Sequence, residues 1–432
     1  MDHSRRQFIK LTSLAMAGSV LPLSACRTKE ELIATGGLSP EYKIKVGLIG
    51  CGGRGTGAAN QALNADSNVE LTAAADIFSE NVQQSLEILT QAHDEKINVS
   101  EENRFVGFDA YQKVLDSGVD VVILASPPAF RPLHLEASVK KGVHIFCEKP
   151  VAVDAPGYHR VIDSVQKAEE KNLSVVSGFC WRYHEPKRAF YNQILNGAVG
   201  DIRAIYNTYN TGDLRLRDRK PEWSEAEFQL QNWLYYTWLS GDHIVEQAVH
   251  SIDFMAWAMG DQPPVSAVGT GGRQVRTSEN YGHIYDHFAI TYQYENGVKG
   301  FHMSRQQPNC DNSYKAEIFG SEGVGRADVT RNEHIIEAKN KWIYEGESNN
   351  MYQTQHDELF AAIRNGVVIN DGYNMANSSM AGIMGRMAAY TGKKVTWDQA
   401  LNSTEKLGPE NVSWDNIPLE HKVAMPGVTS FI

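Results

Sequence analysis

The chain has few cysteines, no basic tract and no long apolar run. Its five cysteines show no CxxC or metal-like spacing, and we interpret those beyond Cys26 as buried free thiols. The formal net charge of -11 argues against a nucleic-acid partner. No internal repeat or low-complexity tract is present. These absences favour a globular protein that acts on a small molecule.

The amino terminus has the pattern of an export signal. Residues 4–10 (SRRQFIK) match the twin-arginine motif, and residues 11–23 supply an apolar stretch too short to span a bilayer comfortably. The tetrapeptide LSAC that ends at Cys26 resembles a lipoprotein processing box. On that resemblance we expect removal of the signal, residues 1–26, and acylation of the Cys26 thiol. The mature protein would then be a periplasmic or envelope-anchored lipoprotein, exported folded and with its cofactor bound.

A length of 432 residues favours two domains. After a polar tether at residues 27–43, short apolar runs alternate with helical segments over residues 44–178. This alternation predicts parallel strands with crossover helices, hence a doubly wound α/β domain. The runs are Val46–Ile49, Val69–Ala75, Val119–Ala125, Val143–Cys147 and Ser174–Gly178.

Residues 179–390 have a different character, with longer and more alternating strand-like runs. They predict a second α/β domain built on a large, open, mostly antiparallel sheet with one exposed or interface face. The runs are Ile202–Tyr209, Val265–Gly271, His287–Tyr294, Gly297–Ser304 and Lys315–Phe319. Helices are expected at Asp357–Arg364 and Met375–Tyr390, and residues 391–432 form a C-terminal segment.

The first strand runs into a glycine-rich turn that is typical of dinucleotide sites. Gly50, Gly52 and Gly55 form a G-x-G-x-x-G pattern between an apolar strand and a helix. Such a turn presents backbone N–H groups and the positive end of a helix to a pyrophosphate. The spacing therefore predicts a bound dinucleotide.

An acid at the end of the second strand indicates which dinucleotide. Asp76 suits a ribose diol and would repel a 2′-phosphate, and its neighbours Ile77 and Phe78 offer that phosphate no cation. The sequence therefore predicts NAD rather than NADP.

Two further tripeptides carry a family resemblance. Together with the glycine turn, the motifs SPP at residues 126–128 and EKP at residues 148–150 resemble landmarks of the Gfo/Idh/MocA family of sugar and cyclitol oxidoreductases. The resemblance covers residues 44 to about 390. It implies a Rossmann domain that holds NAD, and an α/β domain whose open sheet often forms the interface of a homo-oligomer. It also places Lys149 beside the nicotinamide and the reacting carbinol. The predicted cofactor-binding residues are Gly50, Gly52, Gly53, Arg54, Gly55, Asp76, Ser126, Pro127, Glu148 and Lys149.

The third landmark is the segment from Gly241 to Asp253. In one continuous helix, its polar residues His243, Glu246, His250 and Asp253 would share a face. By the resemblance His250 matches the catalytic histidine of the family, and Glu246 stands where the family usually has aspartate. The opposite face would be an apolar stripe formed by Val245, Ala248, Val249 and Ile252.

The predicted catalytic residues are Lys149, His250 and Glu246. His250 suits the removal of a hydroxyl proton, and Lys149 would stabilise the negative charge that develops on the same oxygen. Glu246 would orient the imidazole or bind a neighbouring hydroxyl, and Asp253 would support the site from behind or bind substrate. Redox chemistry itself belongs to NAD.

An aromatic-rich stretch indicates a carbohydrate substrate, because sugar C–H faces lie well against aromatic rings. Its members are Trp181, Tyr183, Tyr206, Tyr209, Trp233, Tyr235, Tyr236 and Trp238. Most of them are expected in the core. We select Trp181, Arg182 and Tyr236, together with Asp253, as candidate substrate residues.

The favoured hypothesis is an NAD-dependent oxidoreductase that acts on a secondary hydroxyl of a sugar or glycoside and uses no metal. One alternative keeps NAD but cleaves glycosides through transient oxidation and elimination. Another is a metal-assisted variant with His243, Glu246 and His250 as ligands. A non-enzymatic lipoprotein that retains NAD only as structure is the remaining alternative.

Overall fold

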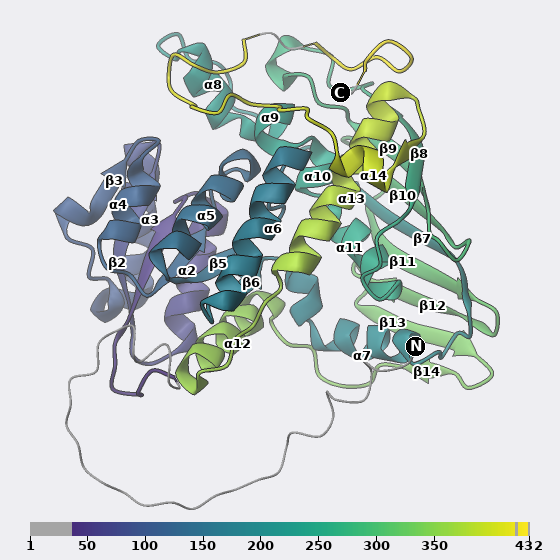
Figure 1. Ribbon diagram of the computed structural model, residues 1–432, viewed down its shortest axis with the longest axis horizontal. Coiled ribbons are helices and arrows are strands. Elements are labelled where there is room, and N and C mark those ends of the chain that lie inside the picture. The colour runs from purple at the N-terminus through teal and green to yellow at the C-terminus, as the bar shows by residue number, and fades with distance from the viewer. Residues whose placement is uncertain (1–36, 420–421, 431–432) are drawn as a thin grey trace, which may run out of the picture.

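The computed structural model describes residues 37–419 and 422–430, which build two β-sheets with helices between and around them (Figure 1). Our expectations for the signal, for Cys26 and for residues 27–36 of the tether concern residues outside these ranges. Within them, no helix is both long and apolar enough to span a bilayer. The predicted fold class, a parallel sheet followed by a mostly antiparallel one, is confirmed.

The first sheet is parallel and has the strand order β3-β2-β1-β4-β5-β6. The order reverses between β1 and β4, and this places a ligand crevice at the carboxyl ends of the strands. The five predicted runs are all present, whereas β3, a short edge strand, was not predicted. The strands are β1 (Ile44–Ile49), β2 (Val69–Asp76), β3 (Arg104–Val106), β4 (Val121–Leu124), β5 (His144–Cys147) and β6 (Val175–Ser177).

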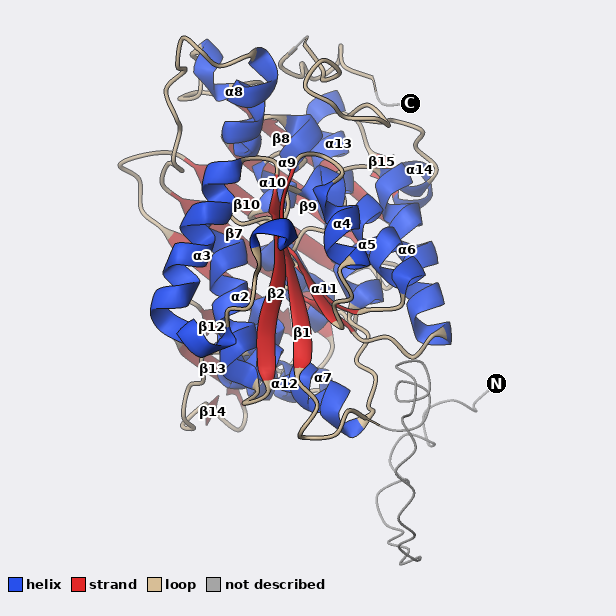
Figure 2. Ribbon diagram, turned by 90° about the vertical axis from the view of Figure 1, so that its left-hand side faces the viewer, coloured by secondary structure: helices blue, strands red, loops and turns tan. Residues whose placement is uncertain are grey.

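Helices cover both faces of this sheet (Figure 2). On one side lie α2 (Gly53–Ala65) and α3 (Ser79–His93), and on the other lie α4 (Ala110–Asp116), α5 (Arg131–Lys141) and α6 (Ala155–Glu170). The central strands are therefore buried on both faces, and this explains why they are continuous apolar runs rather than alternating ones.

One helix from the second half of the chain returns to the first sheet. Helix α12 (Met351–Asn365) packs against α2 and buries Leu359, Phe360 and Ile363 in the same apolar cluster as Leu48. We had placed it, as part of residues 179–390, in the second domain. The two domains are therefore packed directly against each other.

The second sheet has nine strands in the order β14-β13-β12-β11-β7-β10-β9-β8-β15, and only the β7–β10 pair is parallel. Its five predicted runs are confirmed. Strands β12 to β15 were missed because they are glycine-rich, charged or only two residues long. The strands are β7 (Ile202–Thr211), β8 (Ser266–Gly272), β9 (His287–Gln293), β10 (Lys299–Gln306), β11 (Ser313–Gly320), β12 (Gly323–Asp328), β13 (Glu333–Ala338), β14 (Trp342–Ile343) and β15 (Val395–Thr396).

The two faces of this sheet differ. Helices α7 (Glu185–Leu195), α11 (Val249–Ala258) and α13 (Gly372–Thr391) pack on the inner face, and α13 also contacts α6 of the first domain. α14 (Trp397–Leu401) follows β15. The outer face carries apolar side chains that are 36–45% exposed, namely Val268, Phe301, Met303 and Phe319.

Candidate active site

The glycine turn leaves the start of α2 open to a ligand. Gly50 has φ of +98°, and a Cβ there would lie 2.5 Å from the carbonyl carbon of Ala125, so only glycine fits. Gly52 caps α2 without a side-chain hydrogen bond, and the first turn contains no acid. No atom lies within 4 Å of a Cβ built on Gly52 or Gly53. The free N–H groups and this open space fit the pyrophosphate of a dinucleotide.

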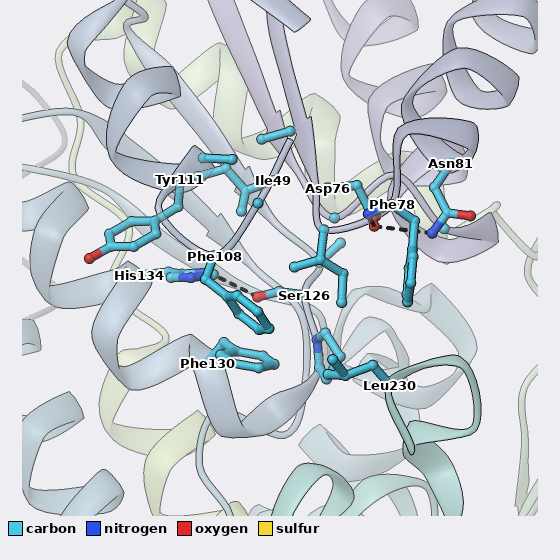
Figure 3. A pocket seen from close by; sticks show the side chains of 18 of the residues that line it. Ile49, Asp76, Phe78, Asn81, Phe108, Tyr111, Ser126, Phe130, His134 and Leu230 are labelled. Carbon is cyan, nitrogen blue, oxygen red and sulfur yellow. Dashed lines mark hydrogen bonds between the residues drawn. The ribbon is translucent and has the colours of Figure 1, made fainter. Parts of the chain in front are cut away.

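Asp76 lies in a pocket beside this turn (Figure 3). Its carboxylate accepts hydrogen bonds from Cys51 N at 2.8 Å, Phe78 N at 3.0 Å and Asn81 Nδ2 at 3.1 Å. Burial raises the pKa of Asp76, and these donors oppose the increase. Among the described residues, no lysine or arginine lines the pocket. Its chemistry therefore fits a ribose diol and provides no counter-ion for a 2′-phosphate.

The remaining wall of this pocket comes from several segments. Ser126 and Pro127, both predicted, lie on the β4 side, and Ser126 Oγ is 3.0 Å from His134 Nδ1. Sequence reasoning did not select five further members of the wall, which follow β2, β3 or β4 or belong to the second domain. They are Phe78, Phe108, Phe130, Leu230 and Trp233. Only tertiary structure brings them together, so no local signal could have identified them.

Arg54 joins the glycine turn to the E-K-P motif. Its Nε lies 2.7 Å from Glu148 Oε1, its Nη2 donates to Gln61 at 2.9 Å, and its guanidinium lies over the Tyr352 ring. Glu148 is buried. Arg54 thus fixes the start of α2 against the residue that precedes Lys149.

Lys149 lies directly against Glu246 of the second domain. Its Nζ donates to the backbone carbonyl of Glu246 at 2.5 Å and lies 3.4 Å from the Glu246 carboxylate. Both side chains keep 12–13% of their surface exposed. The ammonium group is therefore held in place and still accessible to a small ligand.

His250 is an uncharged imidazole in an apolar setting. Its ring stacks on Trp181 at a centroid distance of 4.9 Å and meets Phe179 edge-on at 5.7 Å. Nδ1 is buried and has no hydrogen-bond partner among the described residues. Burial is the main reason that the pKa of His250 lies well below its ordinary value, and Lys149 and Arg54 lower it further. The ring is therefore neutral at pH 7.

The predicted continuous helix from Gly241 to Asp253 is wrong. Helix α10 (His243–Glu246) ends and α11 begins at Val249, so the four polar residues do not share one face. The His250 N–H bonds to Gln247 O at 3.4 Å rather than to Glu246 O. This break leaves the Glu246 carbonyl available to Lys149. It also directs Glu246 to Lys149 and not to the imidazole.

The metal-assisted alternative lacks a ligand set. No group of three or more metal-ligating residues occurs in the part of the chain that the structure describes. His243 is buried, and its ring nitrogens lie 3.1 Å from Tyr285 O and 3.2 Å from Ser304 Oγ. Its role in the structure is to fasten α10 to the second sheet.

Two candidate substrate residues bind each other. Asp253, only 1% exposed, accepts hydrogen bonds from Arg182 Nε and Nη2 and from Ser378. Arg182 also binds Asp261. The sequence predicted Arg182 as a substrate residue, and Asp253 as a substrate residue or as a support of the site, and the structure joins the two in an ion pair.

The last two substrate candidates have different positions. Tyr236 is buried in an apolar cluster with Phe228 and Trp238. Trp181 stacks on the catalytic candidate His250.

The reversal of strand order, the open start of α2, the buried acid at the end of β2 and the contact of Lys149 with Glu246 fit a nicotinamide-dependent oxidoreductase. Residues 44–178 match the "Oxidoreductase family, NAD-binding Rossmann fold", and residues 188–326 match the "GFO/IDH/MocA C-terminal domain". The chain belongs to the Gfo/Idh/MocA family, and NAD is its cofactor. Membership confirms the predicted enzyme class against the non-enzymatic alternative.

Similar proteins include dehydrogenases and a glycosidase. The chain is 22% identical to myo-inositol 2-dehydrogenase of Thermotoga maritima over 68% of this chain and 78% of that protein. It is 26% identical to a glycosyl hydrolase family 109 protein of Solibacter usitatus over 52% of this chain and 50% of that protein. Levoglucosan dehydrogenase, solved with NADH and levoglucosan, has the same fold, with a TM-score of 0.64 at 16% identity, covering 82% of this chain and 100% of that chain. So does the aldose-aldose oxidoreductase of Caulobacter crescentus, with a TM-score of 0.62, 16% identity and the same coverage.

Proposed function

We propose that the protein oxidises a secondary hydroxyl of a sugar or glycoside with NAD. The observation that carries this proposal is the contact of Lys149 with Glu246, which lies four residues before His250 in the second domain. Lys149 follows β5 of the first domain and His250 lies in α11 of the second, so each domain supplies one of the two residues.

The two side chains divide the work at the hydroxyl. NAD, when bound, accepts the hydride from the carbinol carbon. Lys149 donates a hydrogen bond to the hydroxyl oxygen and stabilises its growing negative charge. His250 takes the hydroxyl proton on its imidazole, which is uncharged beforehand. Trp181 fixes the plane of that imidazole by stacking.

The relatives support a polyhydroxylated substrate. The names of two of them state an inositol and an anhydrosugar. We extend that substrate class to this chain. Its test is to purify the protein, quantify bound NAD by mass spectrometry and follow reduced nicotinamide with a panel of sugars, glycosides and inositols. A protein that neither contains nor takes up NAD would refute the proposal.

A second candidate is glycoside cleavage through transient oxidation. Similarity to a glycosyl hydrolase family 109 protein favours it. In this reaction the oxidised sugar loses its glycosidic substituent by elimination, water adds, and the sugar is reduced again. Release of the aglycone from an aryl glycoside in D₂O, with deuterium in the sugar product and no net change in NAD, supports this reaction. Accumulation of an oxidised sugar with reduced NAD supports the dehydrogenase.

Location and assembly are further parts of the proposal. The twin-arginine motif and the cysteine box favour an exported lipoprotein anchored through Cys26 in the cell envelope. The exposed apolar side chains on the outer face of the second sheet favour a homo-oligomer. Metabolic labelling with a fatty acid, lost in a Cys26→Ser variant, tests the anchor.

A further inference from the structure

Residues 403–419, which follow both matched family regions, pack against two phenylalanines that line the NAD pocket. In Figure 1 this yellow segment runs across the top of the molecule from α14 toward α8 (Glu225–Gln231). It contributes Leu407, Val412 and Ile417 to an apolar cluster that also contains the pocket residue Trp233. The segment is therefore packed against the pocket wall.

Trp414 bridges two loops of the Rossmann domain. Its ring centroid lies 5.1 Å from that of Phe108 and 5.9 Å from that of Phe78. Both phenylalanines line the pocket, one after β3 and one after β2. A tight turn, closed by a hydrogen bond from Asn416 N to Ser413 O at 3.1 Å, presents Trp414. The indole thus supports two walls of the adenosine end of the site from outside.

The same segment is attached to both domains. In the Rossmann domain, the Leu407 N–H donates to the Asp154 carboxylate at 3.1 Å. In the second domain, Gln229 Nε2 donates to Pro418 O at 3.0 Å, and Gly408 lies against the Trp238 ring. Gln229 belongs to α8, the helix that also carries the pocket residue Leu230. The segment therefore spans the crevice from one pocket wall to the other.

We propose that residues 403–419 act as a strap that closes the adenosine pocket across both domains, so that the dinucleotide stays bound through repeated turnovers. Release of NAD then requires separation of Leu230 and Trp233 from Phe78 and Phe108, and the strap opposes that separation. This inference rests on the proposed function. It makes Trp414 a positioning residue that acts through the two phenylalanines.

Retention has a consequence for the reaction. A dinucleotide that does not leave has to be returned to its starting oxidation state in the same site. After a carbinol gives its hydride to the bound cofactor and its proton to His250, a carbonyl-bearing carbohydrate has to take both back. That second reactant is either the eliminated product of the same sugar or another sugar molecule. Both cases leave free NAD unused.

The test is the exchange of isotopically labelled NAD. Holoenzyme loaded with labelled NAD is mixed with excess unlabelled NAD, and the label that remains bound is followed by mass spectrometry. We expect release from the wild type to be slower than turnover. We expect Trp414→Ala to release NAD about tenfold faster, which corresponds to about 1.4 kcal/mol. Trp414→Phe should restore most of the retention.

Leu419→Ala is the matched control, because Leu419 is an apolar residue of the same segment with 71% of its surface exposed. Circular dichroism of the NAD-loaded proteins checks that Trp414→Ala, at a position 39% exposed, folds normally. Equal release rates from Trp414→Ala and Leu419→Ala, or wild-type exchange within one turnover, would overturn this inference alone. A wild type that binds no NAD would overturn the proposed function and the strap with it.

Discussion

The ion pair between Arg182 and Asp253 gives a direct test of whether these two residues bind substrate or stabilise the fold. Asp253 is 1% exposed and Arg182 15% exposed, and the Arg182 Nη2 lies 2.7 Å from Asp253 Oδ1. Breaking a buried pair by removing one partner costs about 3–5 kcal/mol, because the other charge stays buried. Asp253→Asn keeps the shape and removes the charge. Asp261, which is 30% exposed, still pairs with Arg182 in this variant. We therefore expect the free energy of unfolding to fall by about 3 kcal/mol, the low end of that range.

The matched control is Asp261→Asn. It removes the outer partner of the same guanidinium, at the solvent-exposed side of the network. Pairs at such positions contribute about 0–1 kcal/mol. The two variants should therefore differ by about 2 kcal/mol or more in the free energy of unfolding. Urea denaturation of the NAD-loaded enzymes measures this difference.

Steady-state kinetics separates a structural role from substrate binding. We expect both variants, assayed well below their unfolding midpoints, to keep the KM of the wild type within a few fold. An Asp253→Asn enzyme with wild-type stability, within about 0.5 kcal/mol, and a strongly raised KM would refute our reasoning. It would show that Asp253 binds substrate directly, which is one of the two roles predicted from the sequence.

Three further predictions concern the site and the outer face. Lys149→Ala should lower kcat by about 10²–10³ and leave the NAD content unchanged, as measured by kinetics and mass spectrometry, because a charge-stabilising donor is lost. Since the pKa of His250 lies well below 6.5, the imidazole stays unprotonated as the pH falls toward 6.5. Protonation of His250 should therefore cause no fall in kcat near pH 6.5. A fall in kcat near that pH that is absent in His250→Gln would contradict this prediction. Phe301→Glu on the outer face should produce a smaller species by light scattering, whereas Val367→Glu, at an exposed position outside the sheets, should not.

Much of the first domain could be predicted from the sequence, because its signals are local. Strands buried on both faces are continuous apolar runs, which can be recognised in the sequence. The glycine turn and Asp76 can be recognised from their residue types and spacing alone. The second sheet was harder to predict. Its central strands alternate and were found, whereas β12, with its two glycines and a charged pair, takes its strand state from its neighbours β11 and β13.

The site was only partly predictable because its geometry depends on a helix break. The polar spacing from His243 to Asp253 fits one helical face, yet helix α10 ends at Glu246. The backbone carbonyl of Glu246 accepts a hydrogen bond from Lys149, which lies almost a hundred residues earlier in the sequence. The partners of Arg182 and the contribution of Trp414 are likewise long-range contacts. A pattern in a single segment carries no information about such partners.

The most direct test of the central claim is the fate of the carbinol hydrogen. Wild-type holoenzyme is incubated with a carbohydrate deuterated at its secondary carbinol carbons, and the bound nicotinamide is analysed by mass spectrometry. The account predicts deuterium in the nicotinamide of the wild type, and its near absence in Lys149→Ala and His250→Ala enzymes that hold equal amounts of NAD. Deuterium transfer that is unchanged when both side chains are removed would contradict it.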